Sequence, residues 1–411
     1  MRDRYNRQPD YLRLSVTDKC NLRCRYCMPH GVACRLQHKD VLSFEETERL
    51  LGILVSLGIK KVRITGGEPL VRRGVTTLIK HIREMQGIEH ISLTTNGVLL
   101  LEKLPALMDA GIDDINISLD TLDREIFRSI TGSDKLPRVL AGMDRAYETG
   151  IPLKINCVPI QGINDREMAD IAAIARDRRI DVRFIELMPL GEGAGYKGVM
   201  QSEIMKQIEK SWGRMIPCED AGICRGVNDS GNRGGTNNAE STSTEGNTDS
   251  ANSVENAGTE GNTDSANSVE NAGTTGNTDS ANSVENVGTA GNTDSANKVE
   301  NAETAGNKGT GEGPAVYYNI EGFKGRIGFI SPISHRFCES CNRLRLTHEG
   351  FLKLCLYHKD GVDLRTPMRE GADDDTLRAM IDDAVTAKPR EHGFTDNTAD
   401  IEKRSMNEIG G

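Results

Sequence analysis

Six of the ten Cys residues fall into two groups of three, and their spacing suits metal binding. Cys20, Cys24 and Cys27 form a C-x3-C-x2-C group. Three thiolates on one short loop can hold three irons of a [4Fe–4S] cluster and leave the fourth iron open. An open iron is useful only where another molecule binds it, so this group predicts a cluster that takes part in chemistry. The alternative is a closed four-Cys zinc or iron–sulfur site completed by Cys34.

A second group, Cys338, Cys341 and Cys355, has the spacing C-x2-C-x13-C. It again offers three thiolates, which predicts a second [4Fe–4S] cluster whose open iron a substrate atom could occupy. The alternative is a structural zinc ion, which needs a fourth ligand. That ligand would be one of three nearby histidines, namely His335, His348 or His358.

Two arginines lie between the Cys residues of the second group. Arg343 and Arg345 have strand spacing, so both guanidinium groups should face the same side. Two such groups beside a metal cluster suit a polyanion, whereas the alternative is a pair of surface arginines on a solvated strand. The sequence contains no G-x4-G-K-[ST] loop, so a nucleotide would have to be held by separate cationic side chains.

The elements that position these residues alternate between strand and helix over residues 1–225. We expect strands at 11–16, 61–65, 90–94, 114–120, 154–159 and 181–187. We expect helices at 43–57, 74–86, 98–110, 123–149 and 165–179. Six βα units of this kind predict an α/β fold, a partial (βα)6 TIM-like barrel, with ligand-binding residues at the carboxyl ends of the strands.

Residues 226–313 differ from the rest of the chain. They contain no aromatic residue and carry 14 acidic against three basic residues, a net charge of −11, while the whole chain carries −10. A 15-residue repeat begins at Gly246 and offers too little apolar surface to offset chain ordering. We therefore expect a disordered insertion, either without function or acting as a tether for a partner. The near-neutral remainder excludes a strongly basic nucleic-acid-binding domain.

The predicted organisation is a partial barrel over 1–225, the insertion over 226–313 and a smaller cluster-binding region over 314–411. The last region contains a predicted helix at 373–387 and ends in Gly410 and Gly411. No run approaches the ~20 apolar residues that span a membrane, and the first residues lack the apolar core of a signal peptide. These features predict a cytoplasmic protein with reduced thiols.

The first Cys group and the second strand end together resemble the radical S-adenosylmethionine (SAM) enzyme family. The resemblance lies in C-x3-C-x-aromatic-C, with Tyr26 as the aromatic residue, and in Gly-Gly-Glu-Pro at 66–69. It implies that SAM binds the open iron and that the Gly-Gly-Glu-Pro loop holds its amino group. It also implies four SAM-binding residues, which are Tyr26, Gly67, Ser118 and Met188.

The two Cys groups in combination resemble the branch of this family that opens molybdenum-cofactor biosynthesis. The resemblance extends over residues 12–20, 185–190 and 325–332 and includes the Gly-Gly end, which is expected to reach into the site. It implies two [4Fe–4S] clusters and a lyase that converts GTP to (8S)-3′,8-cyclo-7,8-dihydroguanosine 5′-triphosphate. The implied GTP contacts are Arg13, Arg63, Thr94, Lys154, Arg343 and Arg345.

Within that set, the resemblance implies that Arg343 and Arg345 are catalytic and hold the substrate as its charge and geometry change. The match of Lys154 to the corresponding family residue allows a shift of one position along the strand.

The implied partners are an electron donor such as flavodoxin or ferredoxin and a downstream cyclic pyranopterin monophosphate synthase. A homodimer is allowed as well. Two other functions compete with this interpretation. One is a different radical SAM enzyme with an auxiliary cluster, such as a peptide-modifying enzyme. The other is an iron–sulfur electron carrier without catalytic activity, which would need neither the Gly-Gly-Glu-Pro loop nor a set of cations.

Overall fold

The computed structural model describes residues 1–28, 37–218, 313–393, 402 and 404–410, and all of them belong to one compact unit. The predicted insertion, apart from Gly313, lies outside the described residues, as does Gly411 of the predicted Gly-Gly end.

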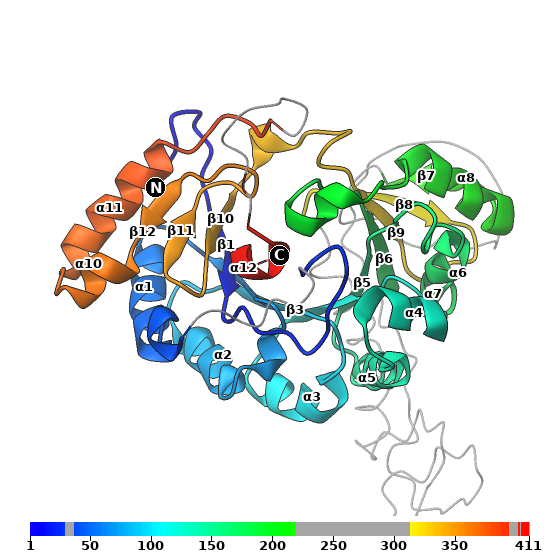
Figure 1. Ribbon diagram of the computed structural model, residues 1–411, viewed down its shortest axis with the longest axis horizontal. Helices are drawn as coiled ribbons and strands as arrows, with labels where there is room; N and C mark the ends of the chain where they lie inside the picture. The colour runs from blue at the N-terminus through cyan, green and yellow to red at the C-terminus, as the bar shows by residue number, and fades with distance from the viewer. Residues whose placement is uncertain (29–36, 219–312, 394–401, 403, 411) are drawn as a thin grey trace, which may run out of the picture. The chain divides into compact units, whose positions relative to one another are not determined.

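The six predicted strands of the barrel are present and lie side by side in chain order, all parallel (Figure 1). They are β1 (Tyr11–Ser15), β2 (Lys61–Thr65), β3 (His90–Thr95), β4 (Asp114–Ser118), β5 (Leu153–Cys157) and β6 (Ile180–Ile185). The α/β fold class and the parallel βα order are therefore confirmed.

The strands that follow residue 313 join both edges of this same sheet. Strand β10 (Arg343–Leu346) pairs in parallel with β1, and β9 (Ile327–Ile330) pairs in parallel with β6. Antiparallel strands complete the order on either side, namely β11 (Phe351–Lys353), β12 (Gly361–Asp363), β8 (Val316–Ile320) and β7 (Met215–Pro217). The second Cys group, which borders β10, thereby comes next to β1 and the first group.

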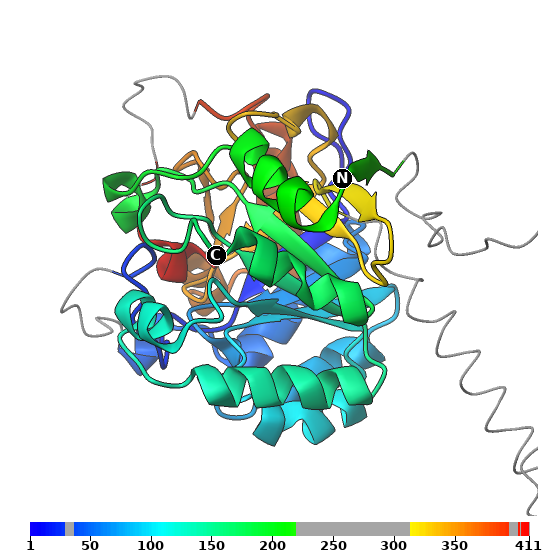
Figure 2. The same cartoon turned by 90° about the vertical axis from the view of Figure 1, so that its right-hand side faces the viewer.

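Helices cover the outer face of the sheet, as Figures 1 and 2 show for α1, α2, α3 and α5. The helices of the barrel are α1 (Phe44–Ser56), α2 (Val75–Glu84), α3 (Leu100–Asp109), α4 (Arg124–Thr131), α5 (Leu136–Glu148), α6 (Met168–Ala172), α7 (Ile174–Asp177) and α8 (Gln201–Trp212). Later helices are α10 (Arg365–Arg369), α11 (Asp374–Thr386) and α12 (Met406–Ile409). Ser43 and Glu46 form the capping box that begins α1.

One predicted helix differs, because residues 165–179 form the two short helices α6 and α7 instead of one. Ala173 separates them but keeps right-handed helical angles, with φ −61° and ψ −17°. The break therefore interrupts the hydrogen-bond ladder and does not reverse the chain.

Side chains alternate along the parallel strands between an apolar outer face and a polar inner face. Leu12 and Leu14 of β1 and Val62 and Ile64 of β2 are fully or almost fully buried in the core beneath the helices. The residues between them are polar, and they include Arg13, Arg63, Asn116, Lys154 and Arg183. A barrel of this kind encloses a polar space suited to a charged ligand, in place of a core filled by branched aliphatic side chains.

Candidate active site

A cavity of about 370 Å³ opens at the carboxyl ends of the parallel strands. Both Cys groups line it, which places Cys20, Cys24, Cys27, Cys338, Cys341 and Cys355 around one space. The cavity also contacts nine further residues expected from the resemblance, namely Arg13, Tyr26, Arg63, Gly67, Thr94, Ser118, Met188, Arg343 and Arg345. Lys154 lines an adjoining cavity instead.

The loop of the first Cys group packs directly against the Gly-Gly-Glu-Pro loop that follows β2. A Cβ atom on Gly67 would lie 2.5 Å from the Lys19 carbonyl oxygen and 2.6 Å from that of Asp18. Gly66, with φ +153°, brings this loop within hydrogen-bond distance of the backbone at Thr17. The Gly67 N–H donates to the Thr17 carbonyl oxygen at 2.7 Å. Glycine is required here because any side chain would push the two loops apart.

Burial raises the pKa of the thiols in the first Cys group. Burial is the largest cause for Cys20, Cys24 and Cys27, and the pKa of Cys27 rises to about 12. The Asn96 side-chain amide lies 3.7 Å from the Cys20 sulfur, and the backbone of Asn407 hydrogen-bonds to Cys27. Such thiols need a bound cation to become thiolates, as an iron–sulfur cluster provides.

Two buried carboxylates stand beside this loop. Glu68 accepts hydrogen bonds from the Thr95 hydroxyl at 2.8 Å and from the Asn96 N–H at 2.7 Å, and burial raises its pKa to about 7. Asp120 accepts a hydrogen bond of 2.6 Å from Tyr26, and burial raises its pKa to about 6. A bound ammonium group would favour the charged form of such carboxylates.

The second Cys group is held by cations from distant parts of the chain. The Lys388 ammonium donates to the carbonyl oxygens of Arg343, at 2.9 Å, and Leu354, and so ties the segments that carry Cys341 and Cys355. Burial alone would raise the pKa of Cys341, but the charge of Lys388 and a backbone hydrogen bond from Arg343 lower it below its ordinary value. Cys341 therefore favours the thiolate even without metal, whereas burial raises the pKa of Cys338.

The described part of the chain holds no group of three or more His, Cys, Asp and Glu side chains arranged around a single metal ion. The two Cys groups are compatible with that finding, because each thiolate of a [4Fe–4S] cluster binds a different iron. The all-sulfur donor sets lining one cavity fit two such clusters.

Five arginines line the cavity, and four of them were predicted, namely Arg13, Arg63, Arg343 and Arg345. The surrounding protein desolvates them, which lowers the pKa of Arg13 well below its ordinary value and that of Arg345 to about 10. Arg343 has a lowered pKa for the same reason. The pKa of Arg63 is raised because nearby Tyr11 and Asp114 outweigh the effect of burial. A row of desolvated cations is costly in the free protein and suits a polyanionic ligand.

Lys154 is buried in the adjoining cavity, which has a volume of about 290 Å³ and shares Tyr11, Arg63, Cys341 and Arg343 with the first. The two cavities therefore meet at the Arg63–Arg343 wall, and Lys154 stands near the other cations without bordering the same space.

Asn156, Arg183 and Asn407 of the cavity were not predicted. Each has a side-chain atom without a hydrogen-bond partner within the described ranges, namely Asn156 Oδ1, Arg183 Nε and Asn407 Oδ1, as does the predicted Thr94 at Oγ1. Such buried atoms need an explanation, and a bound ligand would provide one. Arg183 and Asn156 could have been found from the two-residue period of polar residues on β5 and β6, whereas Asn407 comes from the chain end and carries no local signal.

Two family profiles match the sequence. The radical SAM superfamily matches residues 14–175, and Molybdenum Cofactor Synthesis C matches residues 274–394. The GTP 3′,8-cyclase of Clostridium perfringens (strain 13 / Type A) is 37% identical over 411 residues, and that of Heliobacterium modesticaldum is 37% identical over 413, with all of both chains covered in each case. Streptococcus suis SuiB bound to S-adenosylmethionine matches 44% of this chain and 40% of its own, at 22% identity and a TM-score of 0.35.

The parallel barrel, the Cys group at its strand ends and the superfamily match define a radical SAM enzyme. The chain belongs to the GTP 3′,8-cyclase family, because it aligns over its full length with members at 37% identity. As predicted, enzymes of this family use [4Fe–4S] clusters and S-adenosylmethionine. The full-length similarity argues against the peptide-modifying enzyme and the electron carrier. No helix in the described residues is long and apolar enough to cross a membrane.

Proposed function

We propose that this protein is a GTP 3′,8-cyclase, which converts GTP to (8S)-3′,8-cyclo-7,8-dihydroguanosine 5′-triphosphate as the first step of molybdenum-cofactor biosynthesis. The observation that carries the proposal is the single cavity that both Cys groups and five arginines line. When bound, S-adenosylmethionine at the first cluster supplies the 5′-deoxyadenosyl radical that starts the reaction on GTP. The protein contributes binding, orientation and exclusion of water.

The proposed residue roles are those that the family resemblance implies, and their positions around the cavity support them. Cys20, Cys24 and Cys27 would hold the first cluster, with Tyr26, Gly67, Ser118 and Met188 around S-adenosylmethionine. Cys338, Cys341 and Cys355 would hold the second, whose open iron would be available to the guanine base. The triphosphate would meet Arg13, Arg63, Arg343, Arg345 and Lys154, with Thr94 offering its unpaired hydroxyl. Charge-assisted contacts with several cations replace the P-loop.

Anaerobic incubation of the reconstituted enzyme with S-adenosylmethionine, dithionite and GTP tests the proposal. Both 5′-deoxyadenosine and the cyclised nucleotide should appear, in about equal amounts. Cys338→Ala should keep the first cluster, lower the iron content from about eight to about four per chain and abolish the nucleotide product. Cys157→Ala is the matched control, since Cys157 is fully buried on β5 and does not line the cavity. Nucleoside formation without cyclised GTP in the parent enzyme would refute the proposal.

The same proposal includes its partners. A flavodoxin or ferredoxin would deliver electrons to the first cluster, and a cyclic pyranopterin monophosphate synthase would consume the product. The cytoplasm is the proposed compartment, because the six Cys of the two groups are free thiols and must stay reduced to bind iron. A homodimer is proposed and can be tested by sedimentation of the reconstituted enzyme.

A further inference from the structure

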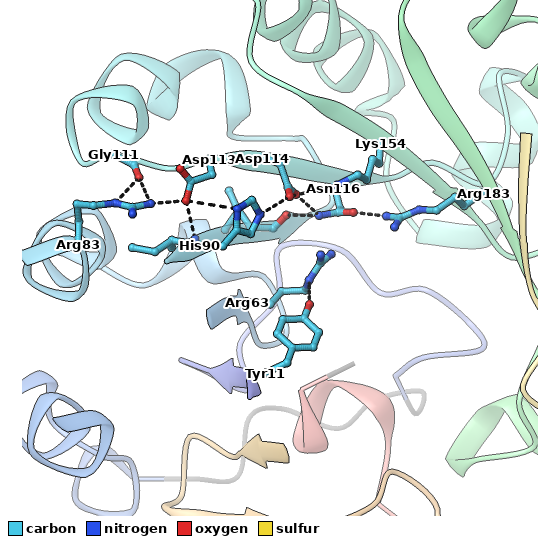
Figure 3. A network of polar contacts seen from close by, with 12 residues as sticks. Tyr11, Arg63, Arg83, His90, Gly111, Asp113, Asp114, Asn116, Lys154 and Arg183 are labelled. Carbon is cyan, nitrogen blue, oxygen red and sulfur yellow. Dashed lines mark hydrogen bonds and ion pairs between the residues drawn. The ribbon is translucent and has the colours of Figure 1, made fainter. Parts of the chain in front are cut away.

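A buried polar network lies on the inner face of strands β3 to β6, near the start of each strand (Figure 3). Asp114, the first residue of β4, is 2% exposed. One of its carboxylate oxygens accepts a hydrogen bond from His90 Nε2 at 2.7 Å and another from the Lys154 ammonium at 3.1 Å. The other oxygen accepts from the Asn116 side-chain amide at 2.9 Å. A single carboxylate thus joins three strands.

Asn116 extends this network to the next cation. Its side-chain oxygen accepts a hydrogen bond from the Arg183 guanidinium, while its amide nitrogen also donates to the Leu93 carbonyl oxygen at 3.2 Å. Asp114 therefore holds Lys154 directly and Arg183 through Asn116. Figure 3 shows the four side chains following one another across β4, β5 and β6.

The two cations lie on the two cavities that meet at Arg63 and Arg343. Arg183 lines the main cavity, and Lys154 lines the adjoining one beside Arg63. A buried ammonium and a guanidinium that face other cations repel them, and an acceptor is needed to hold each side chain in one direction. Asp114 accepts from the Lys154 ammonium, and Asn116 accepts from the Arg183 guanidinium, so each cation has an acceptor on β4.

We propose that Asp114 and Asn116 are positioning residues, which hold Lys154 and Arg183 in place for the phosphate groups of the substrate. The inference rests on the proposed function and names no contact between Asp114 and GTP. Asp114 acts by fixing the direction of the Lys154 ammonium and by keeping it charged.

The electrostatic surroundings of Lys154 support this role. Burial lowers the pKa of Lys154, Asp114 raises it again, and Arg183 and Arg63 lower it. Asp181 of β6 is in register with Lys154, and His90 of β3 donates to Asp114. Removing the carboxylate of Asp114 would therefore lower the pKa of Lys154 further, and the ammonium would lose its proton at a lower pH than in the parent enzyme.

The test compares GTP binding by anaerobically reconstituted parent and Asp114→Asn enzymes, by calorimetry and by KM, between about pH 7 and pH 9.5. We expect the variant to bind GTP about tenfold more weakly, with kcat changed less than about twofold, and to lose affinity at lower pH as pH rises. Asp113→Asn is the matched control, because Asp113 bonds to Arg83 and to the Ile91 N–H at 2.6 Å and contacts His90 Nδ1 at 3.7 Å, but bonds to neither Lys154 nor Asn116. Asp113→Asn should leave the GTP affinity and its pH dependence unchanged.

A double-mutant cycle shows whether Asp114 acts through Lys154. In a Lys154→Met background, Asp114→Asn should lose clearly less GTP affinity than it does in the parent, and the loss that remains is the part that acts through Asn116 and Arg183. Additive losses would overturn the inference. So would a lowered thermal midpoint with unchanged KM and pH profile, or tighter GTP binding by Asp114→Asn. If the parent enzyme itself bound no GTP, the proposed function would fail first, and this inference with it.

Discussion

Arg13 and Arg345 stand directly opposite each other on the neighbouring parallel strands β1 and β10. Arg63 of β2 is in register with Arg13 on its other side, so three guanidinium groups occupy one level of the sheet. Like charges in register destabilise a sheet, and here the surrounding protein also desolvates them. Repulsion within this row of three arginines therefore destabilises the ligand-free protein, and a bound polyanion would offset it.

Arg13→Met should change stability and binding in opposite directions. Methionine keeps an unbranched apolar chain in the row while removing the central charge. We expect the thermal midpoint of the ligand-free protein to rise by about 2–4 °C, and GTP affinity to fall by about tenfold or more. Scanning fluorimetry and calorimetry measure the two effects. Arg138→Met, at an exposed ion pair with Glu102, is the control and should change neither. A less stable variant with intact GTP affinity would contradict the argument.

Gly410 brings the chain end against the same row. The Arg345 guanidinium donates to its carbonyl oxygen at 2.9 Å, and a Cβ atom on Gly410 would lie 2.8 Å from Ser15 Cβ. Gly410→Ala should therefore displace the chain end, remove an acceptor from Arg345 and lower kcat/KM for GTP by about tenfold. Gly150→Ala is a matched control, because its φ of +76° is close to the +74° of Gly410 and nothing lies within 4 Å of the added atom. Equal losses in both variants would assign the effect to backbone strain alone.

Glu402 anchors the segment that leads to this chain end, and its ionisation should make stability depend on acid. It accepts a hydrogen bond from the Lys353 ammonium. It also accepts two from the Arg404 guanidinium, at 2.9 and 3.1 Å. Burial would raise the pKa of Glu402, but these bonds lower it to about 2. The folded state therefore holds the carboxylate more strongly than the unfolded state does, and this stability is complete above about pH 4.5 and is lost as pH falls toward 2.

Glu402→Gln should remove this acid-sensitive contribution, which is on the order of 1–3 kcal/mol. The free energy of unfolding of the variant, measured by denaturant titration, should be lower than that of the parent near pH 7. The difference should shrink below about pH 4.5 and disappear only as pH falls to about 2. A constant difference across the whole range would mean that ionisation of Glu402 contributes nothing. Glu148→Gln, on the exposed end of α5, should leave the pH dependence unchanged.

The strand order and the first Cys loop could be predicted because local patterns specify them. Apolar runs bounded by glycine and capping residues marked β1 to β6, and the spacing of Cys20, Cys24 and Cys27 marked the loop after β1. The pairing of β9 with β6 and of β10 with β1 could not be predicted in this way. Strands more than a hundred residues apart in the chain join through backbone hydrogen bonds that leave no periodic signal.

Arg183 shows what the sequence interpretation missed within a correctly predicted strand. The sequence analysis expected ligand-binding residues at the carboxyl ends of the strands, which directs attention to the loops. In the structure the inner face is polar, so Asp181 and Arg183 alternate with Val182 and Phe184. Alternation of this kind in a parallel strand indicates a cavity. The same alternation of polar and apolar residues along β4 would have indicated Asp114 and Asn116.

Removing the insertion should change GTP turnover and stability little. Strands β7 and β8 are antiparallel neighbours, with Pro217 opposite Tyr318, and the Cys218 N–H donates to the Tyr317 carbonyl oxygen at 2.9 Å. The chain thus leaves and re-enters the sheet at adjacent positions. Deleting 226–313 joins residue 225 to 314 and leaves a loop of about ten residues, a length that hairpins accept at small entropic cost.

The deletion variant should keep GTP turnover within about twofold of the full chain and unfold within about 2 °C of it. Deleting 226–320 is the control, since it also removes β8 and exposes the edge of β9. That variant should lose stability or fail to fold. A large loss of turnover in the shorter deletion, with the thermal midpoint unchanged, would show that the insertion acts in catalysis or recruits a partner, because the sheet around β7 and β8 would then be intact.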